Sequence, residues 1–267
     1  MTLLHDTFRH LDTARLPTPC FVVDAALLER NLQLLRRVQE ESGAKVLLAL
    51  KGFAMYHYAP LIARYLSGVC ASGLHEAKLG RDYFGGEVHT FSAAYPPADM
   101  AEVLALSDHV IFNSFSQWQR YREQALATYY NKYRDQPLVI DKWFAVQAQD
   151  HSEGALERIT ALAEHPDFHP DNPNRFRALV STLMQQNPAI FHAEDGSGYR
   201  FAASQIRRIL LSNPQVAARM LNGYAIVSRM DNERKALVRA ELETLAAVDG
   251  ISVDVRENLE RLQRGLQ

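Results

Sequence analysis

A lysine at the end of a short apolar run is the residue of this sequence best suited to covalent chemistry. The run Val46–Leu50 ends in Lys51, and a glycine follows. An amine shielded from water by such a run is favoured in its neutral form, which is the form that adds to an aldehyde to make a Schiff base. The alternative is a structural lysine, whose alkyl stem covers the end of a strand while its ammonium group stays in water.

Polar residues also stand at the ends of three later apolar runs. Ser72 ends the run 68–72, Ser92 ends the run 87–92, and Asn113 lies in the run 109–114. In parallel βα folds the carboxyl ends of the strands meet on one side of the fold, where functional residues gather. We therefore expect these three side chains on the same side as Lys51. The alternative for each is a structural role, in which its hydrogen bonds cap the end of a strand.

The elements that would position these residues are five short apolar runs, each followed by a segment that favours a helix. The runs are rich in β-branched and aromatic residues, and regular alternation of such strands with helices predicts a parallel sheet of βα units. We expect part of a TIM-type barrel with five strands. The predicted strands cover residues 20–24, 45–51, 68–72, 87–92 and 109–114.

The second half of the chain lacks such runs and consists of amphipathic segments separated by proline. Asn-Pro pairs at 172–173, 187–188 and 213–214 predict helix starts, because asparagine caps a helix and proline suits its first turn. The predicted fold class is therefore α/β plus all-α, with a helical bundle or superhelix after the partial barrel. We expect the domains at residues 1–123 and 124–267.

Composition excludes several classes of partner. The chain has 267 residues, of which 47% are hydrophobic, enough for a sizeable core. Its formal net charge of −2 gives no electrostatic reason for binding to nucleic acid or an anionic membrane, so we expect neither as a partner. The two cysteines, Cys20 and Cys70, lie in apolar surroundings, which predicts buried thiols in a reducing compartment. The first ten residues lack the pattern of a secretion signal. We expect a cytoplasmic protein.

Residues from about 14 to 123 resemble the N-terminal part of carboxynorspermidine decarboxylase, of the alanine-racemase-like class of pyridoxal-phosphate enzymes. The resemblance is carried, in order, by LPTPCFVVD, AKVLLALKGFA, GVCASGLHEAKLGR, GGEVHTFSAAY and SDHVIFNSFSQW. It implies that Lys51 forms the Schiff base with pyridoxal 5'-phosphate, and that Ser72, Ser92 and Asn113 line the cofactor side. The implied reaction is decarboxylation of carboxynorspermidine or carboxyspermidine, a small-molecule precursor in polyamine biosynthesis, with the cofactor ring as electron sink.

The sequence departs from that family after the fifth predicted strand. A TIM barrel has eight strands, and the family's Gly-rich phosphate loop and C-terminal β domain have no counterpart after residue 124. Gly196 and Gly198 lie between predicted helices, which makes them a poor phosphate cradle. We therefore expect any decarboxylase in this chain to be incomplete.

Residues from about 124 to 267 resemble the C-terminal helical domain of bacterial aminopeptidase N, a zinc peptidase of the M1 class. The resemblance is carried by PLVIDKWFAVQAQ, LAEHPDFHPDNPNRFRALVSTL, PAIFHAEDGSGYRF and NPQVAARML. It implies a cap without zinc ligands, in which Arg177 and Arg219 face the substrate channel. Salt bridges between helices are the alternative for both arginines. We predict no metal site and no zinc in this chain.

Three hypotheses about function follow from these two resemblances. The chain is a decarboxylase that depends on Lys51, a non-catalytic helical module derived from an aminopeptidase, or a fusion without activity as a unit. A partial barrel leaves two open sheet edges, and open edges pair readily with other chains. We therefore also expect self-association through these edges.

Overall fold

The chain divides into two units, residues 1–125 and 126–267. A computed structural model describes residue 8 and residues 11–266. The prediction of no secretion signal in the first ten residues therefore falls mostly outside the described residues. Among the described helices, none has the length and apolar character needed to span a lipid bilayer.

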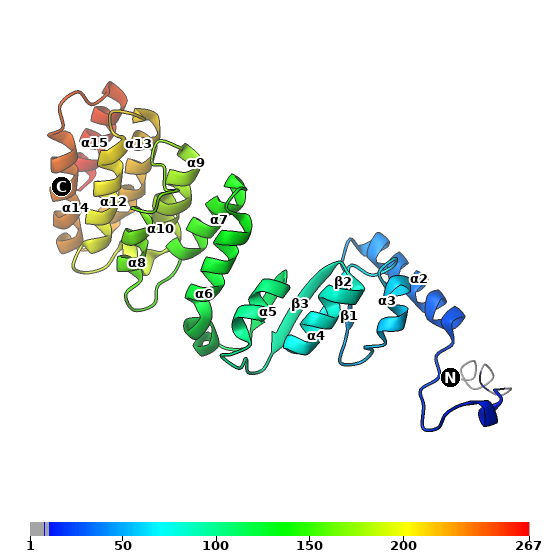
Figure 1. Ribbon diagram of the computed structural model, residues 1–267. Helices are drawn as coiled ribbons and strands as arrows, with labels where there is room; N and C mark the ends of the chain where they lie inside the picture. Colours follow the sequence, from blue (N-terminus) through cyan, green and yellow to red (C-terminus); the bar gives the residue numbers. More distant parts are fainter. Residues whose placement is uncertain (1–7, 9–10, 267) are drawn as a thin grey trace. The chain divides into compact units, whose positions relative to one another are not determined.

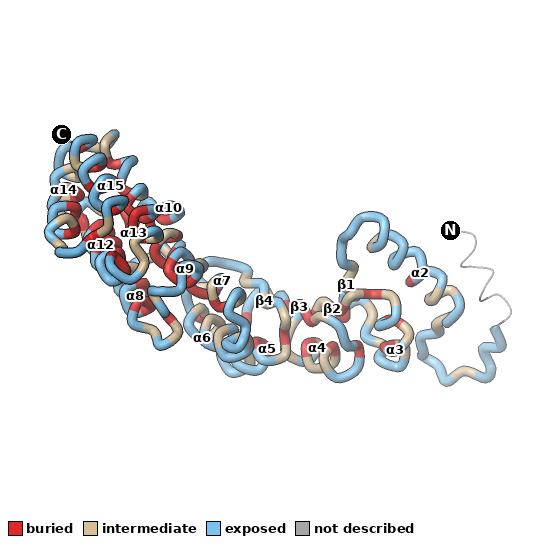
Figure 2. Tube along the Cα trace, turned by 90° about the horizontal axis from the view of Figure 1, so that it is seen from above, coloured by how far each residue is buried: buried red, intermediate tan, exposed pale blue. Residues whose placement is uncertain are grey.

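The first unit contains a four-stranded parallel sheet in the order β1-β2-β3-β4. In Figure 2, α3, α4 and α5 lie along one side of the row of strands. The elements are η1 (Thr13–Arg15), α2 (Ala25–Ser42), β1 (Leu47–Ala49), η2 (Tyr56–Tyr58), α3 (Ala59–Ile62), β2 (Gly68–Ala71), α4 (Leu74–Leu79), the π-helical turn η3 (Gly80–Phe84), β3 (Glu87–Ser92), α5 (Met100–Leu106) and β4 (His109–Phe112). Figure 1 labels the helix α6 (Phe115–Tyr133), which follows β4 along the chain. The boundary between the two units falls within this helix.

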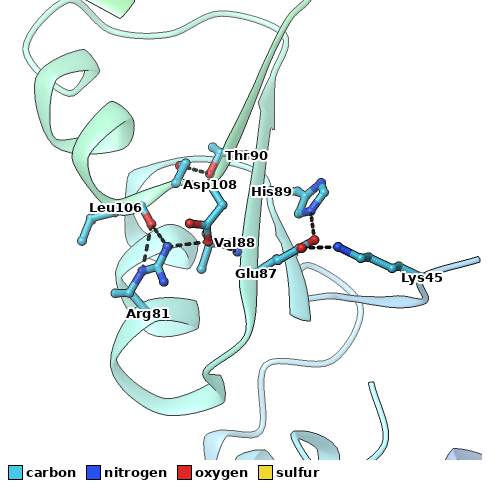
Figure 3. Close-up of polar contacts among 9 residues, drawn as sticks. Lys45, Arg81, Glu87, Val88, His89, Thr90, Leu106 and Asp108 are labelled. Carbon is cyan, nitrogen blue, oxygen red and sulfur yellow. Dashed lines mark hydrogen bonds and ion pairs between the residues drawn. The ribbon is translucent and has the colours of Figure 1, made fainter. Parts of the chain in front are cut away.

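Strand residues alternate between the two faces of this sheet. Val69 and Val88 point toward the helices and are buried with Ile62 and Phe84. On the helix-covered side, Arg81 donates to the carbonyl oxygen of Leu106 and to Asp108, as Figure 3 shows. The other face, which we call the open face, carries Glu87, His89, Phe91, His109 and Ile111, all at least partly exposed.

The predicted strand at residues 20–24 is wrong, so the sheet has four strands and not five. Within the described residues this segment joins no sheet, and the Phe21 ring is 94% exposed. An extended segment without a neighbouring strand has no partner for its backbone hydrogen bonds. Asp24 instead caps α2, accepting from the backbone nitrogens of Ala26 and Leu27 at 2.9 and 3.0 Å.

The prediction of two buried cysteines is wrong. Cys20 lies in the unpaired segment and is exposed, whereas Cys70 lies on β2 and is half-buried. Both thiols are free.

The second unit is helical, as predicted. Its helices share one continuous core that includes the fully buried rings of Phe144, Phe176 and Tyr224. The helices are α7 (Pro137–Ala148), α8 (Ala155–Leu162), α9 (Pro173–Phe176), the π-helical turn η4 (Arg177–Ser181), α10 (Thr182–Gln186), α11 (Pro188–Phe191), α12 (Ser197–Ile209), α13 (Pro214–Leu221), the 3₁₀ helix η5 (Asn222–Arg229), α14 (Asn232–Ala246) and α15 (Val253–Gly265). Figure 2 shows buried residues along most of them.

The three Asn-Pro pairs begin helices, which confirms the prediction. Asn172, Asn187 and Asn213 each accept a hydrogen bond from a backbone nitrogen in the first turn of α9, α11 and α13, with proline in the first position. The buried amide of Asn187 also donates to the carbonyl oxygens of Ala148 and Asp150, at 3.0 and 2.7 Å. One residue therefore caps α11 and attaches it to the end of α7.

Candidate functional site

The prediction that Lys51 is shielded from water is wrong, because its side chain is exposed. The strand β1 ends at Ala49, Leu50 is buried, and Lys51 lies in the turn that follows. The predicted strand 20–24 is not present beside β1, so β1 lacks a described neighbour on that side. Lys51 consequently lacks the desolvation on which the Schiff-base hypothesis depends.

Ser72, Ser92 and Asn113 lie at the carboxyl ends of β2, β3 and β4, on the side of the sheet where Lys51 follows β1. Their backbone N–H groups already donate within the unit. Ser72 donates to the Glu76 carboxylate at 2.7 Å and Asn113 to the Gln117 side-chain oxygen at 2.7 Å.

Ser92 follows the same pattern. Its N–H donates to the Tyr95 hydroxyl at 3.1 Å, and its own hydroxyl donates to the carbonyl oxygen of Ala94 at 2.9 Å. Each of the three strand ends is therefore capped by a side chain from the segment that follows it. The structural alternative accounts for the contacts of all three residues.

These residues do not fit pyridoxal phosphate. Phosphate groups bind to backbone N–H groups that point outward from a loop or a helix N-terminus, and the three strand-end donors are already used. The amine that would receive the aldehyde is exposed to water, where an imine is readily hydrolysed.

The two predicted channel arginines lie on different helices of the second unit and differ in their contacts. Arg177 donates to the Pro173 carbonyl oxygen at 3.0 Å and to the Asn174 side-chain oxygen at 2.7 Å, so it is attached to its own helical turn. Arg219 is exposed on α13, and within the part of the chain that the structure describes its guanidinium has no hydrogen-bond or ion-pair partner. Among the described residues, neither arginine forms the salt bridge between helices that was its structural alternative.

Arg219 lines a surface groove of about 460 Å³ between α13 and α15. The groove also contains Asp254, Glu257 and Asn258 from α15. It is polar and carries both signs of charge, so it suits a ligand with a charged end group.

Two histidines of the second unit are half-buried against its aromatic side chains. His165 lies among the rings of Tyr130, Trp143 and Phe144, and burial lowers the pKa of its imidazole. His192 Nδ1 is 2.9 Å from the Tyr199 hydroxyl, and burial likewise lowers its pKa.

Sequence reasoning missed one group of chemically competent side chains, on the open face of the sheet. Glu87, His89 and His109 each place a ligand-type atom within 4.8 Å of the other two. The signal was present in the predicted strands: a Glu-x-His pair in one run, and a histidine at the start of the next. What was absent from the sequence was the register that sets the two histidines side by side.

Comparison with known proteins identifies the family. The sequence model of a family described as "Domain of unknown function (DUF3458_C) ARM repeats" matches residues 32–264. The chain belongs to this family. Armadillo repeats are helical, which agrees with the second unit, whereas the match before residue 126 covers the βα unit.

Individual relatives confirm both resemblances. Aminopeptidase N of Caulobacter vibrioides is 47% identical over 136 residues, which are 51% of this chain and 16% of the relative. A carboxynorspermidine/carboxyspermidine decarboxylase of Herminiimonas arsenicoxydans is 47% identical over 108 residues, 40% of this chain and 30% of the relative. The chain thus spans less than a third of the length of either enzyme.

A solved structure supports the resemblance to aminopeptidases at the level of the fold. The crystal structure of Legionella pneumophila aminopeptidase A in complex with aspartic acid is 25% identical and superposes with a TM-score of 0.52. The match covers 72% of this chain and 20% of that one. The helical part of this family member is therefore aminopeptidase-like in sequence and in fold.

Proposed function

We propose that this chain acts through its helical unit, as a non-catalytic peptide-binding module of the aminopeptidase N type. The observation that carries the proposal is the Arg219 guanidinium in the groove between α13 and α15, which has no partner among the described residues. An exposed guanidinium is a planar fork of donors that suits a carboxylate, such as the C-terminus of a peptide. Asp254 and Glu257 on the facing helix suit a positively charged group of the same ligand.

Isothermal titration of the full chain with short peptides tests this function. A peptide with a free C-terminal carboxylate should bind, and its C-terminally amidated counterpart should bind roughly tenfold more weakly, because it lacks the charged acceptor. Arg219→Ala should weaken binding of the peptide with a free carboxylate by the same factor. Arg229→Ala is the matched control, since Arg229 is also exposed but does not line this groove.

The proposal fails if Arg219→Ala and Arg229→Ala lower the affinity for the peptide equally, or if no peptide binds. An aminopeptidase assay of the same protein, with and without added zinc, separates binding from catalysis. We expect no cleavage, because the resemblance covers only the helical domain and not a catalytic one.

The second candidate is a pyridoxal-phosphate decarboxylase of the carboxynorspermidine/carboxyspermidine type, in the cytoplasm and in polyamine biosynthesis. The order of Lys51, Ser72, Ser92 and Asn113 along one edge of the sheet favours it. The exposure of Lys51 and the occupied strand-end donors disfavour it. A fusion without activity as a unit is the conclusion if neither peptide nor cofactor binds.

A further inference from the structure

The open face of the sheet brings two imidazoles and a carboxylate together from adjacent strands. His89 on β3 pairs in register with His109 on β4. Glu87 lies two residues before His89, and residues two apart on a strand share a face. Figure 3 shows Glu87 and His89 on one side of the sheet, away from Arg81, Asp108 and Thr90 on the other.

The three side chains already converge. Glu87 Oε2 lies 3.0 Å from His89 Nε2, and the rings of His89 and His109 stack with their centroids 4.2 Å apart. One ligand-type atom of each residue lies within 4.8 Å of the other two. Ligands around a tetrahedral zinc ion, with bonds of about 2.0–2.1 Å, are about 3.3 Å apart. The stacked imidazole rings must therefore turn before their nitrogen atoms point at one ion.

We propose that Glu87, His89 and His109 form a binding site for a divalent transition-metal ion of the zinc type. Two imidazoles and one carboxylate are a ligand set that such ions accept, and three protein ligands leave one coordination position open. The ion would join β3 to β4 on the face that the helices leave uncovered. The site is separate from the strand-end residues and from the groove of the second unit, so it does not depend on the proposed function.

Lys45 competes with a metal ion for the carboxylate of Glu87. Its ammonium group forms an ion pair with Glu87 Oε1, the second oxygen of the same carboxylate (Figure 3). A cation bound at Glu87 must share the carboxylate with this ammonium group or displace it. Lys45 is 62% exposed, so its side chain has room to move away. Removing the positive charge of Lys45 should therefore strengthen metal binding. If Glu87 were not a metal ligand, this substitution would leave the metal affinity unchanged.

Titration of the metal-free full chain with Zn²⁺, followed by calorimetry, tests the site. We expect one zinc ion per chain, and His89→Ala or His109→Ala should weaken its binding by at least the roughly 10–100-fold that loss of an outer-shell partner costs. Lys45→Gln should strengthen it roughly fivefold. Co²⁺ in place of Zn²⁺ should give the visible spectrum of a tetrahedral site, and the His109→Ala protein should lack it.

Two control variants make the result specific. Cys70→Ser alters the register neighbour of His89 on β2, whose sulfur is not among the converging atoms. His57→Ala removes an exposed histidine elsewhere in the same unit. Both should change zinc binding by less than about twofold. His109 is exposed, so its replacement should leave folding intact, which circular dichroism checks.

Three results would overturn the proposal. The first is zinc binding that is equal in the wild type, His89→Ala and His109→Ala proteins. The second is a loss of zinc affinity in the Cys70→Ser protein as large as the loss in the His109→Ala protein. The third is zinc binding so weak that any exposed histidine accounts for it. In that case the His57→Ala protein would lose as much zinc affinity as the His109→Ala protein.

Discussion

Arg175 Nε donates to Asp141 Oδ1 at 2.6 Å, in an ion pair of which only 8% and 15% of the two side chains are exposed. The guanidinium also lies over the Phe144 ring, 4.9 Å from its centroid, and donates to the carbonyl oxygen of Asp167. The pair connects α9 to α7 through one buried charge from each helix. All these contacts of the Arg175 guanidinium lie within the second unit. The contribution of the ion pair to the free energy of unfolding of that unit can therefore be measured.

We expect Arg175→Met to lower the free energy of unfolding of the helical unit by about 3–5 kcal/mol, because Asp141 would keep a largely buried charge without its partner. Urea denaturation followed by circular dichroism measures this. Arg177→Met is the control, since Arg177 is exposed and bonded only to its own turn, and it should change stability by less than about 0.5 kcal/mol. Equal effects of the two substitutions would contradict the assigned role of Arg175.

Asp150 makes stability depend on pH in the acid range. Its burial favours the neutral acid, but hydrogen bonds from Arg158 and Ser152 outweigh burial and lower its pKa from 3.8 to about 2. A carboxylate whose pKa is lower in the folded state stabilises that state above its unfolded pKa. The contribution is therefore lost progressively as the pH falls below about 4 and through about 2.

We expect Asp150→Asn to destabilise the helical unit at pH 6 by about 1 kcal/mol, a value reduced for solvent screening because a quarter of this side chain is exposed. The difference from the wild type should shrink as the pH falls below about 4 and disappear only below about pH 2. Urea denaturation of both proteins across this range measures it. A difference that stays constant with pH would show that ionisation of Asp150 is not its cause.

Lys51 should show no special affinity for pyridoxal phosphate. The wild type and Lys51→Ala proteins should give the same absorbance spectrum when the cofactor is added, because this lysine is as accessible to water as other surface lysines. Lys142→Ala, which removes an exposed lysine of the other unit, is the control. Borohydride reduction followed by peptide mapping locates any imine. A band that only Lys51→Ala abolishes would restore the decarboxylase hypothesis.

The sheet should mediate self-association. Its end strands β1 and β4 lack a second described neighbour, and Phe91 and Ile111 on the open face are 44% and 40% exposed. We expect dimers or larger species that increase with concentration, and Phe91→Lys with Ile111→Lys should weaken their association roughly tenfold. Light scattering after gel filtration measures this.

Leu138→Lys is the control for that experiment, because Leu138 is 73% exposed on the helical unit. It should leave association unchanged. A protein that stays monomeric at all concentrations, or an equal response to both kinds of variant, would show that the sheet is not the contact surface.

The sequence by itself determined most elements of the fold. Four of the predicted strands form, and the Asn-Pro pairs begin α9, α11 and α13. These features depend on interactions within a few residues: the periodicity of apolar side chains and an amide oxygen that meets the N–H groups of its own first turn. Such local signals do not require knowledge of the rest of the chain.

Only the tertiary structure decided which of these elements gain partners. Residues 20–24 have the composition of a strand but no strand beside them, so they remain exposed and Lys51 is left in solvent. The pairing of His89 with His109 follows from the register of β3 and β4, which no local pattern specifies. A strand's environment is set by neighbours distant in sequence, and the chemistry of its side chains is therefore settled only when the sheet assembles.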